Sequence, residues 1–352
     1  MDPERGHSST RRAPRTLKWA VLSVAAAVTT TLVRPAFGWD DFGHLQVTAE
    51  AYEHLKPDSK HRAAELVRLN PRYSEWTKGV AASQRDRVAF ILAATWADAI
   101  KSDPEYTDKN DQQSLPSAAQ NLGYADKLRH RYWHFVDQPF SPDHTPMLAA
   151  LAPNAQTQIE AFRATIAYGE AEDALKSYDL VWLLHLVGDL HQPLHCVSRY
   201  DAAAPSGDRG GNSVRITGAS LPTVCDDAKY CKAPPHELHA FFDDITGEGN
   251  RLDRVTAAVK MLPKVKDSLA TNIDVAAWLK EGLESAETAV YVSPIGVGDG
   301  PFTIDASYER AALALARHRI ALAGLRLAQL LDDVLVKEAA AKKQRNNPHH
   351  ET

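Results

Sequence analysis

The sequence predicts an all-α protein: a single helix-rich domain with long loops gathered over one end. Apolar residues recur at helical spacing through most of the chain, and no stretch alternates long enough to form a sheet. With 352 residues and 44% hydrophobic content, the chain is large enough to bury one sizeable core. Two polar, glycine- and proline-containing stretches, 102–127 and 199–235, read as long loops. Loops of this length usually serve or cover a site.

Helical periodicity predicts helices from the first third of the chain to its end. The expected helices span 47–69, 85–100, 154–169, 171–190, 251–270, 275–290 and 307–341, with one short strand at 213–217. The helix over 171–190 is so apolar that we expect it at the core of a bundle. We also expect the charged tail, residues 337–352, to be disordered.

The first 38 residues have the features of an export signal. Basic residues over 11–18 precede an apolar run over 19–33, and the small residues of 36–38 stand at cleavage-site spacing. We therefore expect residues 1–38 to be a signal peptide, the mature chain to begin at Trp39, and the protein to be secreted or periplasmic. An uncleaved membrane anchor is the alternative, although the run is short for a membrane span.

The charge balance limits how the protein can bind an anion. The full chain carries a formal charge of −5. Losing the leader removes six basic and two acidic residues, which leaves −9. Such a chain cannot hold a polyanion by a diffuse basic surface, so bound cations would have to attract an anionic substrate.

The three cysteines suit an exported protein. Cys225 and Cys231 lie in one polar loop, and we expect them to form a disulfide, leaving Cys196 free and buried. A disulfide between Cys196 and one of the loop cysteines stays open. A zinc site at CxxxxxC is the weaker interpretation, because the chain has no matching second pair.

The stretch from 183 to 196, LLHLVGDLHQPLHC, carries the clearest chemical signal. His185 and Asp189 are four residues apart, so on a helix their side chains share one face. Pro193 discourages further helix, which allows His195 to return toward that face. Imidazole and carboxylate together suit zinc. A buried His–Asp hydrogen bond without metal would give the same pair.

Further ligand-type residues lie on otherwise apolar segments. They are His44, Asp98, His134, and the pair His239 and Asp243, which repeats the i, i+4 spacing. Taken singly, Asp98 could cap a helix or pair with Lys101, and His134 could be an ordinary core histidine. Burying so many polar groups costs several kcal/mol unless they are paired or bound to metal, and a metal cluster satisfies them together.

In order along the chain, these residues resemble the secreted, single-strand-specific zinc nucleases of the S-one/P-one type. The resemblance runs from Trp39 to about Leu331 and rests on Trp39-x4-His44, Trp96-Ala97-Asp98, His134-x2-Asp137, His185-x3-Asp189-x5-His195, Gly210-Gly211-Asn212 and His239-x3-Asp243. Bacterial zinc phospholipase C is a more distant likeness. It has a longer gap after its N-terminal tryptophan and a glutamate where this chain has Asp243.

The resemblance implies a nuclease domain over 39–336 with a trinuclear zinc cleft beneath the long loops. Asp98, His134, His185 and Asp189 would hold the first zinc. The Trp39 amine and carbonyl, His44 and the shared Asp189 would hold the second, so activity would require cleavage of the leader. His195, His239 and Asp243 would hold the third, which leaves water positions open.

The resemblance also implies roles for four further residues. Asp137 would orient the attacking water, although it could be a plain surface acid. Lys101 stands where well-known members have an arginine that contacts phosphate; lysine keeps the charge but loses the bidentate fork. Phe135 would stack an unpaired base, unless it is only core packing, and Asn212 could read a base edge.

The expected function is zinc-dependent endonuclease activity on single-stranded DNA and RNA, giving 5′-phosphate products, with 3′-nucleotidase activity. In-line attack by a zinc-activated water would break the P–O3′ bond. Single-stranded nucleic acids and 3′-nucleotides would be the substrates of a monomer with no stable protein partner and no membrane contact in its mature form. A phospholipase C-like lipid hydrolase and a non-catalytic exported zinc-binding protein are the alternatives.

Overall fold

In the computed structural model, which describes Met1 and residues 39–168, 170–220 and 233–346, the expected all-α fold is confirmed. The α-helices are α1 (Asp41–His54), α2 (Pro57–Val67), α3 (Tyr73–Trp76), α4 (Arg85–Ala93), α5 (Trp96–Ala99), α6 (Ala155–Tyr168), α7 (Asp173–Asp189), α8 (Leu238–Asp244), α9 (Leu252–Val259), α10 (Asp267–Ala270), α11 (Val275–Ser285) and α12 (Ala306–Asn346). A π-helical turn, η5 (Ala286–Val290), continues α11, and short 3-10 helices are η1 (Ala82–Gln84), η2 (Gly123–Ala125), η3 (Arg131–His134) and η4 (Pro193–His195).

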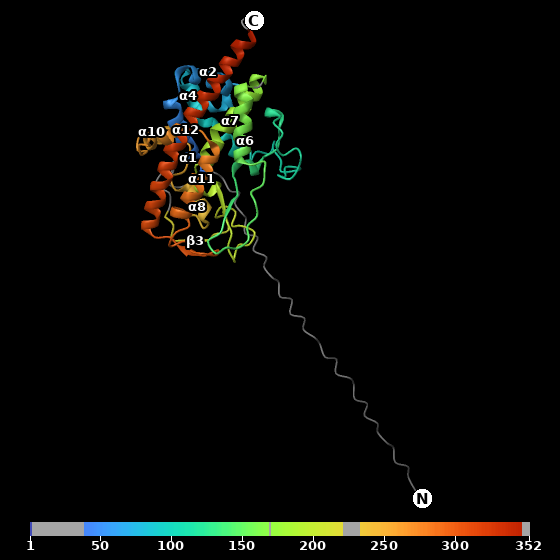
Figure 1. Cartoon of the computed structure of the whole chain (residues 1–352), viewed down its shortest axis with the longest axis vertical. Coiled ribbons are helices and arrows are strands. Elements are labelled where there is room, and N and C mark those ends of the chain that lie inside the picture. The colour runs from blue at the N-terminus through green and yellow to red at the C-terminus, as the bar shows by residue number, and fades with distance from the viewer. Residues whose placement is uncertain (2–38, 169, 221–232, 347–352) are drawn as a thin grey trace. The chain divides into compact units, whose positions relative to one another are not determined.

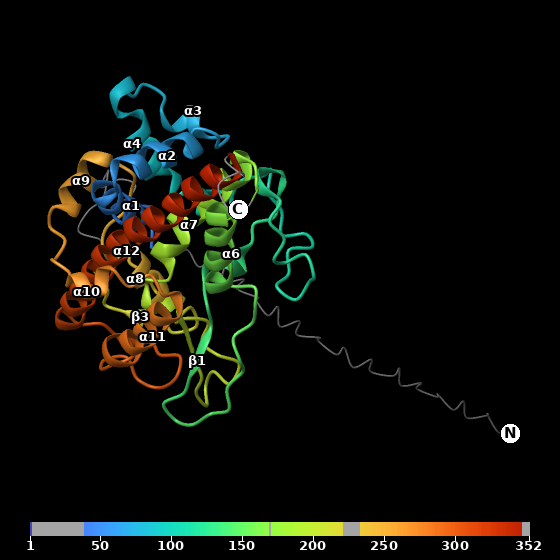
Figure 2. The ribbon, with the colours of Figure 1, turned by 45° about the horizontal axis from the view of Figure 1, so that its top comes forward.

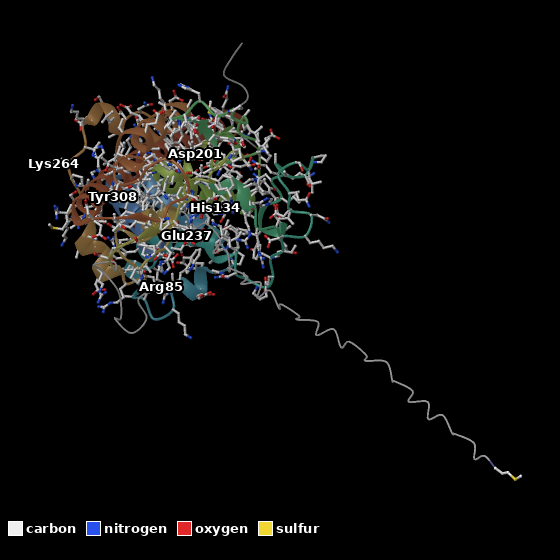
Figure 3. The ribbon with its side chains drawn as sticks, turned by 90° about the horizontal axis from the view of Figure 1, so that it is seen from below. Arg85, His134, Asp201, Glu237, Lys264 and Tyr308 are labelled. Carbon is white, nitrogen blue, oxygen red and sulfur yellow. The ribbon has the colours of Figure 1, made fainter. Side chains whose placement is uncertain are left out.

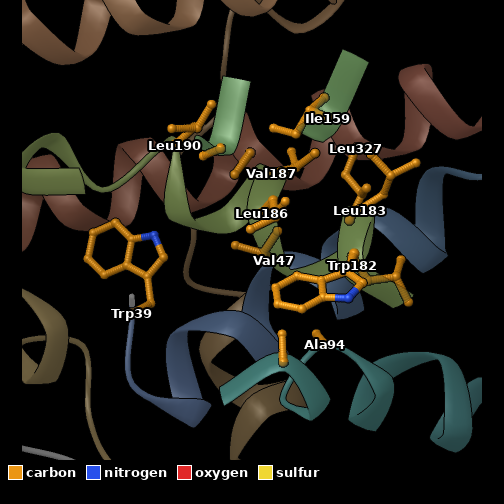
Figure 4. Packing of buried hydrophobic residues seen from close by; sticks show 14 of the residues in the cluster. Trp39, Val47, Ala94, Ile159, Trp182, Leu183, Leu186, Val187, Leu190 and Leu327 are labelled. Carbon is orange, nitrogen blue, oxygen red and sulfur yellow. The ribbon is translucent and has the colours of Figure 1, made fainter. Parts of the chain in front are cut away.

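Helix α7 forms the centre of the bundle, as its continuous apolar sequence predicts. Every side chain from Lys176 to Asp189 is buried. Helices α6, α2, α12 and α1 pack against it, and the long α12 also runs along α1 and α6 (Figures 1 and 2). Figure 4 shows the resulting core, in which Trp182, Leu183, Leu186 and Val187 of α7 face residues of several other helices. A helix that is apolar on all sides has no solvent face and must lie inside.

The strands are few and short, but one pair matters for the site. Strand β1 (Gln138–Phe140) pairs in parallel with β2 (Val197–Arg199), with Gln138 opposite Val197. Strand β3 (Ile216–Thr217) pairs in parallel with β4 (Phe302–Thr303). Figure 1 shows β3 and α8 at one end of the bundle and α2 and α4 at the other, while the predicted loop over 102–127 lies beside α6.

Several predicted helices are interrupted in the structure. The helix expected over 47–69 begins earlier, at Asp41, and breaks before Pro57, because proline lacks the donor that a continuous helix needs. The helix expected over 85–100 breaks between α4 and α5, and the one over 251–270 divides into α9 and α10. The tail expected to be disordered from residue 337 is helical as far as Asn346, because α12 continues through alanine- and lysine-rich sequence that favours helix.

Two further expectations concern the cysteines and the membrane. Cys196 is a free, fully buried thiol, as expected. Cys225 and Cys231, the predicted disulfide pair, lie outside the described residues. Within the described residues, no helix combines the length and the apolar character needed to cross a membrane.

Candidate metal centre

All eight side chains predicted to bind metal come together in the interior. Their donor atoms form three groups: His44, His185 and Asp189; Asp98, His134 and His185; and His195, His239 and Asp243. None of the eight residues is more than 6% exposed. His134 lies near the middle of the view from below in Figure 3. The described helices therefore enclose a polar centre within an apolar core.

Local geometry explains two of the pairs. His185 and Asp189 are one turn apart on α7, with Nε2 and Oδ2 3.1 Å apart. His239 and Asp243 repeat this on α8, with Nε2 and Oδ2 3.5 Å apart. On a helix, residues i and i+4 face the same side, so each helix presents an imidazole and a carboxylate together.

The parallel β1–β2 pair brings His134 beside His195. Each histidine ends a short 3-10 helix just before its strand, His134 at the end of η3 and His195 at the end of η4. The strand pairing continues upstream as a hydrogen bond from Val136 N to His195 O of 2.8 Å. His195 Nδ1 in turn donates to the His134 carbonyl at 2.7 Å. Two residues 61 positions apart in sequence are thus placed by backbone hydrogen bonds rather than by a shared helix.

His44 reaches the centre because α7 carries a glycine where the two helices meet. A Cβ atom at Gly188 would lie 2.9 Å from His44 Nδ1. The His44 ring stacks on His185 with a centroid distance of 3.9 Å, and its Nε2 lies 3.3 Å from Asp189 Oδ1. Gly188 therefore admits His44 to the metal centre.

The start of the expected mature chain is attached to the same region. The Trp39 indole is fully buried and donates from Nε1 to the Gly188 carbonyl at 3.0 Å. The backbone N–H of Asp40 donates to the Asp243 carbonyl at 3.0 Å. The backbone at Trp39 is thus anchored next to Asp189 on one side and at Asp243 on the other.

The donor atoms of Asp98, His134, His185 and Asp189 have the spacing of a coordination shell. His134 Nδ1 lies 2.9 Å from His185 Nε2 and 3.0 Å from Asp189 Oδ2. Asp98 Oδ1 lies 3.6 Å from His185 Nε2 and 3.7 Å from His134 Nδ1. With bonds of about 2.0 Å, the ligand atoms of tetrahedral zinc lie roughly 3.3 Å apart. The residues present therefore fit a zinc ion.

The third group is oriented by backbone carbonyls. His195 Nδ1 donates to His134 O, and His239 Nδ1 donates to Gly210 O at 2.6 Å. In the neutral rings, each Nε2 then carries a lone pair, and the two Nε2 atoms face each other at 3.1 Å. Two facing lone pairs beside the Asp243 carboxylate repel unless a cation lies between them. His185 is held in the same way, donating from Nδ1 to Ala94 O at 2.7 Å.

Several buried donor atoms in the first two groups have no hydrogen-bond partner. Both ring nitrogens of His44, His134 Nε2 and Asp189 Oδ1 are such atoms; Asp98 Oδ1 also lacks a hydrogen bond, although it forms an ion pair with Lys101. An unsatisfied buried polar atom costs about 1–3 kcal/mol, so a cluster of them is expensive without a ligand. Bound cations would satisfy His44 Nε2, Asp98 Oδ1 and Asp189 Oδ1, whereas His44 Nδ1 faces Gly188 and His134 Nε2 lies on the other side of its ring from Nδ1.

The carboxylates of the centre are held in the ionised form. Burial alone would raise the pKa of Asp189, but the His185 and His195 rings hold it well below its usual value. Burial would also raise the pKa of Asp98, but the nearby Lys101 and His185 lower it below its usual value. Ionised carboxylates are the form that binds zinc.

The imidazoles of His134 and His44 are held neutral. Burial lowers the pKa of His134 to about 3, and the Lys101 charge adds to the effect. Burial also lowers the pKa of His44. The pKa of His185 is raised despite burial, because it faces the Asp189 and Asp98 carboxylates. A proton on His185 thus takes the place that a cation would fill.

Lys101 is part of this centre rather than of the surface. It is 4% exposed, and its Nζ lies 2.6 Å from Asp98 Oδ1. The ion pair between Asp98 and Lys101, which the sequence suggested as an alternative role for Asp98, is therefore present. Asp98 nevertheless also faces His134 and His185, so the ion pair does not replace the cluster.

A cavity of about 400 Å³ is lined by Phe135 and Asp137, which closely follow the metal-group residue His134 in sequence. Its other walls are Gln113, Leu148, Ala149, Ala150, Leu151, Asn154 and Tyr200. Burial, with the nearby Asp208 charge, raises the pKa of Asp137 to about 6. Asn212 is not among the lining residues; its side-chain amide donates to the Arg209 carbonyl at 2.7 Å.

Sequence reasoning missed the groups that orient the predicted ligands. Gln192 donates from Nε2 to Asp243 Oδ1 at 2.8 Å, and its Oε1 accepts from Leu194 N. Gly210, which supplies the carbonyl for His239, has φ +60°, and a Cβ there would lie 2.2 Å from Leu194 O. The glycine pair was a signal for this turn, whereas nothing in the sequence marks a carbonyl as a partner of histidine.

The comparisons with known proteins agree with this site. The family model for S1/P1 nuclease matches residues 39–336, and this family is zinc-dependent. No curated protein matches the sequence. The match covers most of the chain and includes every candidate metal ligand, so the protein belongs to the S1/P1 nuclease family, whose members are hydrolases of phosphodiester bonds.

Proposed function

We propose that this nuclease is a zinc-dependent endonuclease of single-stranded DNA and RNA that leaves 5′-phosphate products and also acts as a 3′-nucleotidase. The observation that carries the proposal is the trio of buried His/Asp groups beside a cavity lined by Phe135 and Asp137. A cavity with an aromatic side chain in its wall can stack an unpaired base. Only a single strand offers such a base, and the stacking does not depend on whether the sugar is that of DNA or RNA.

Three zinc ions would be held as the resemblance implies. Asp98, His134, His185 and Asp189 would hold the first, and His195, His239 and Asp243 the third. His44, Asp189 and the Trp39 amine and carbonyl would hold the second. When bound, zinc lowers the pKa of water and neutralises charge on phosphate oxygens.

The chain's own residues would position the substrate and the attacking water. Asp137, a carboxylate at neutral pH, accepts a hydrogen bond from that water and orients it. Lys101 contributes a buried positive charge near Asp98, which favours a phosphate at the centre. Phe135 stacks the base beside the scissile bond. Asn212 contacts a base edge through the amide oxygen that its bond to Arg209 leaves free.

The proposal includes export with removal of residues 1–38. Support comes from Trp39, whose indole is buried against Gly188 while Asp40 N is bonded to Asp243 O. A new amine at Trp39 would therefore arise close to Asp189 and Asp243. Mass spectrometry of the exported protein should find Trp39 at the N-terminus. A mature protein that retained its leader and stayed active would contradict the amine ligand.

Hydrolysis of denatured DNA and of a 3′-mononucleotide tests the activity. We expect a chelator to abolish both reactions, zinc to restore them, and Asp189→Asn to lower turnover by more than about 10³-fold, because this carboxylate faces both His44 and the His134–His185 pair. Activity that survived both the chelator and the substitution would remove the zinc mechanism.

A phospholipase C-like activity is the second candidate. The observation that favours it is the exposed apolar pair Leu148 and Leu151 on the cavity wall, 65% exposed each. Hydrolysis of phosphatidylcholine vesicles without any cleavage of single-stranded DNA would select this alternative. Cleavage of DNA without lipid hydrolysis would exclude it.

A further inference from the structure

Arg209 lies in the turn that supports the third metal group. Its backbone N–H donates to Ser198 Oγ at 3.2 Å, and its carbonyl accepts from the Asn212 side chain. The next residue, Gly210, provides the carbonyl that orients His239. One peptide unit thus separates Arg209 from the group that holds a metal ligand in place.

The backbone at Arg209 is fixed in a conformation that an arginine rarely adopts. Its φ is +58°, in the left-handed region that favours glycine. The residues on both sides, Asp208 and Gly210, are buried, whereas Arg209 is exposed. Asp208 secures the turn by accepting from Arg199 N at 2.9 Å and from Gly211 N at 3.2 Å. The fold thus holds the backbone rigidly while the guanidinium projects outward.

The guanidinium of Arg209 makes no hydrogen bond or ion pair with the parts of the chain that the structure describes. Its positive charge nevertheless acts on Asp137, which lines the cavity, by lowering the pKa that burial raises. Arg131, which donates to the Lys101 carbonyl, is paired with Asp108, as is Arg129.

We propose that Arg209 binds a phosphate of the nucleic acid next to the phosphate that is cleaved. The planar guanidinium can donate two parallel N–H hydrogen bonds to the oxygens of one phosphate. The cleaved phosphate would lie at the metal centre, where Lys101 already supplies a buried cation. Arg209 is exposed, and it directly precedes Gly210, whose carbonyl orients His239, so a strand that leaves the centre past His239 can reach it. The inference rests on the proposed nuclease activity.

This contact has a consequence for specificity. A mononucleotide or a dinucleoside monophosphate carries only the phosphate that is cleaved, so Arg209 contributes nothing to its binding. A longer strand carries a neighbouring phosphate and gains the contact. Arg209 therefore favours polynucleotides over the smallest substrates, in a chain whose net charge would otherwise repel them.

Steady-state kinetics of the zinc-loaded enzyme test this with two thymidine substrates: the dinucleotide, which has one phosphate, and the trinucleotide, which has two. For Arg209→Gln, we expect KM for the trinucleotide to rise about tenfold with kcat unchanged, and KM for the dinucleotide to stay constant. On a longer single strand, the slope of log KM against log salt should fall by roughly 0.7, the value for one lost phosphate contact. Arg209→Lys should retain most of that slope.

Arg85→Gln is the matched control. Arg85 is an exposed arginine that starts α4, and the far end of that helix leads to Ala94 at the metal centre, about 14 Å away. Figure 3 shows Arg85 at the lower edge of the folded part, away from His134. This control should change neither KM. An equal effect of Arg209→Gln on both substrates, or no effect on either, would overturn the inference. A wild-type enzyme that cleaved neither substrate would instead refute the proposed function on which it rests.

Discussion

Gly188→Ala should weaken one metal site without unfolding the protein. Gly188 lies in the last turn of α7, where a Cβ would meet His44 Nδ1 at 2.9 Å and His44 Cε1 at 3.2 Å. Ordinary contact begins at about 3.4 Å, so the ring must retreat by about 0.5 Å. His44 is stacked on His185 and fully buried, which leaves the ring little room to do so.

Two opposing effects decide the outcome. Alanine in a helix is favoured over glycine by about 1 kcal/mol, which stabilises α7 whether or not metal is bound. The displacement of His44 acts on the second metal site, where a misplacement of about 0.5 Å reaches the limit of what a preorganised site tolerates. We expect zinc affinity at one site to fall by roughly tenfold to a hundredfold, and turnover by about tenfold.

Zinc titration monitored by calorimetry, with turnover on denatured DNA, measures both effects. The zinc-free variant serves as its own control, because a thermal unfolding midpoint near that of the zinc-free wild type shows that the fold is retained. The variant should then show two sites of unchanged affinity and one weakened site. Three unchanged sites would refute the close approach of α1 to α7 as the reason for this glycine. A destabilised zinc-free form would instead show that the clash with His44 also costs folding free energy.

Three further predictions concern stability and substrate binding. Burial raises the pKa of Asp179 from 3.8 to about 8, so the folded protein keeps a proton that the unfolded chain releases, and stability falls as pH rises from about 4 to about 8. Asp179→Asn should therefore raise the unfolding midpoint over wild type far more at pH 8 than at pH 4, and an equal shift at both pH values would contradict the assignment. Glu281→Ala leaves the buried Arg319 and Arg326 without their shared carboxylate and should cost about 3–5 kcal/mol in urea unfolding; a cost below 1 kcal/mol would show that the pairs contribute little. Phe135→Ala should raise KM for single-stranded DNA about tenfold with kcat nearly unchanged, whereas an unchanged KM would assign Phe135 to core packing.

The helix predictions succeeded where the pattern was local and failed where tertiary contacts interrupt it. The helix over 171–190 was predicted closely, because an apolar sequence with few breaks has one stable solution inside a bundle. The break between α4 and α5 could not be predicted, because that stretch shows no proline or glycine. There the Ala94 carbonyl accepts the hydrogen bond of His185 Nδ1, a partner 91 positions away.

The sequence by itself determined which side chains could bind metal. His185 with Asp189, and His239 with Asp243, are local pairs that helical spacing places on one face. Residue type then restricted the chemistry to ions that accept imidazole and carboxylate.

Only the tertiary structure decided how those residues meet and what orients them. The β1–β2 pairing joins His134 to His195, Gly188 admits His44, and Gly210 directs His239. These contacts depend on which backbone group faces which ring after packing. Every residue carries the same backbone carbonyl, so its partner is fixed by the path of the folded chain rather than by the local sequence.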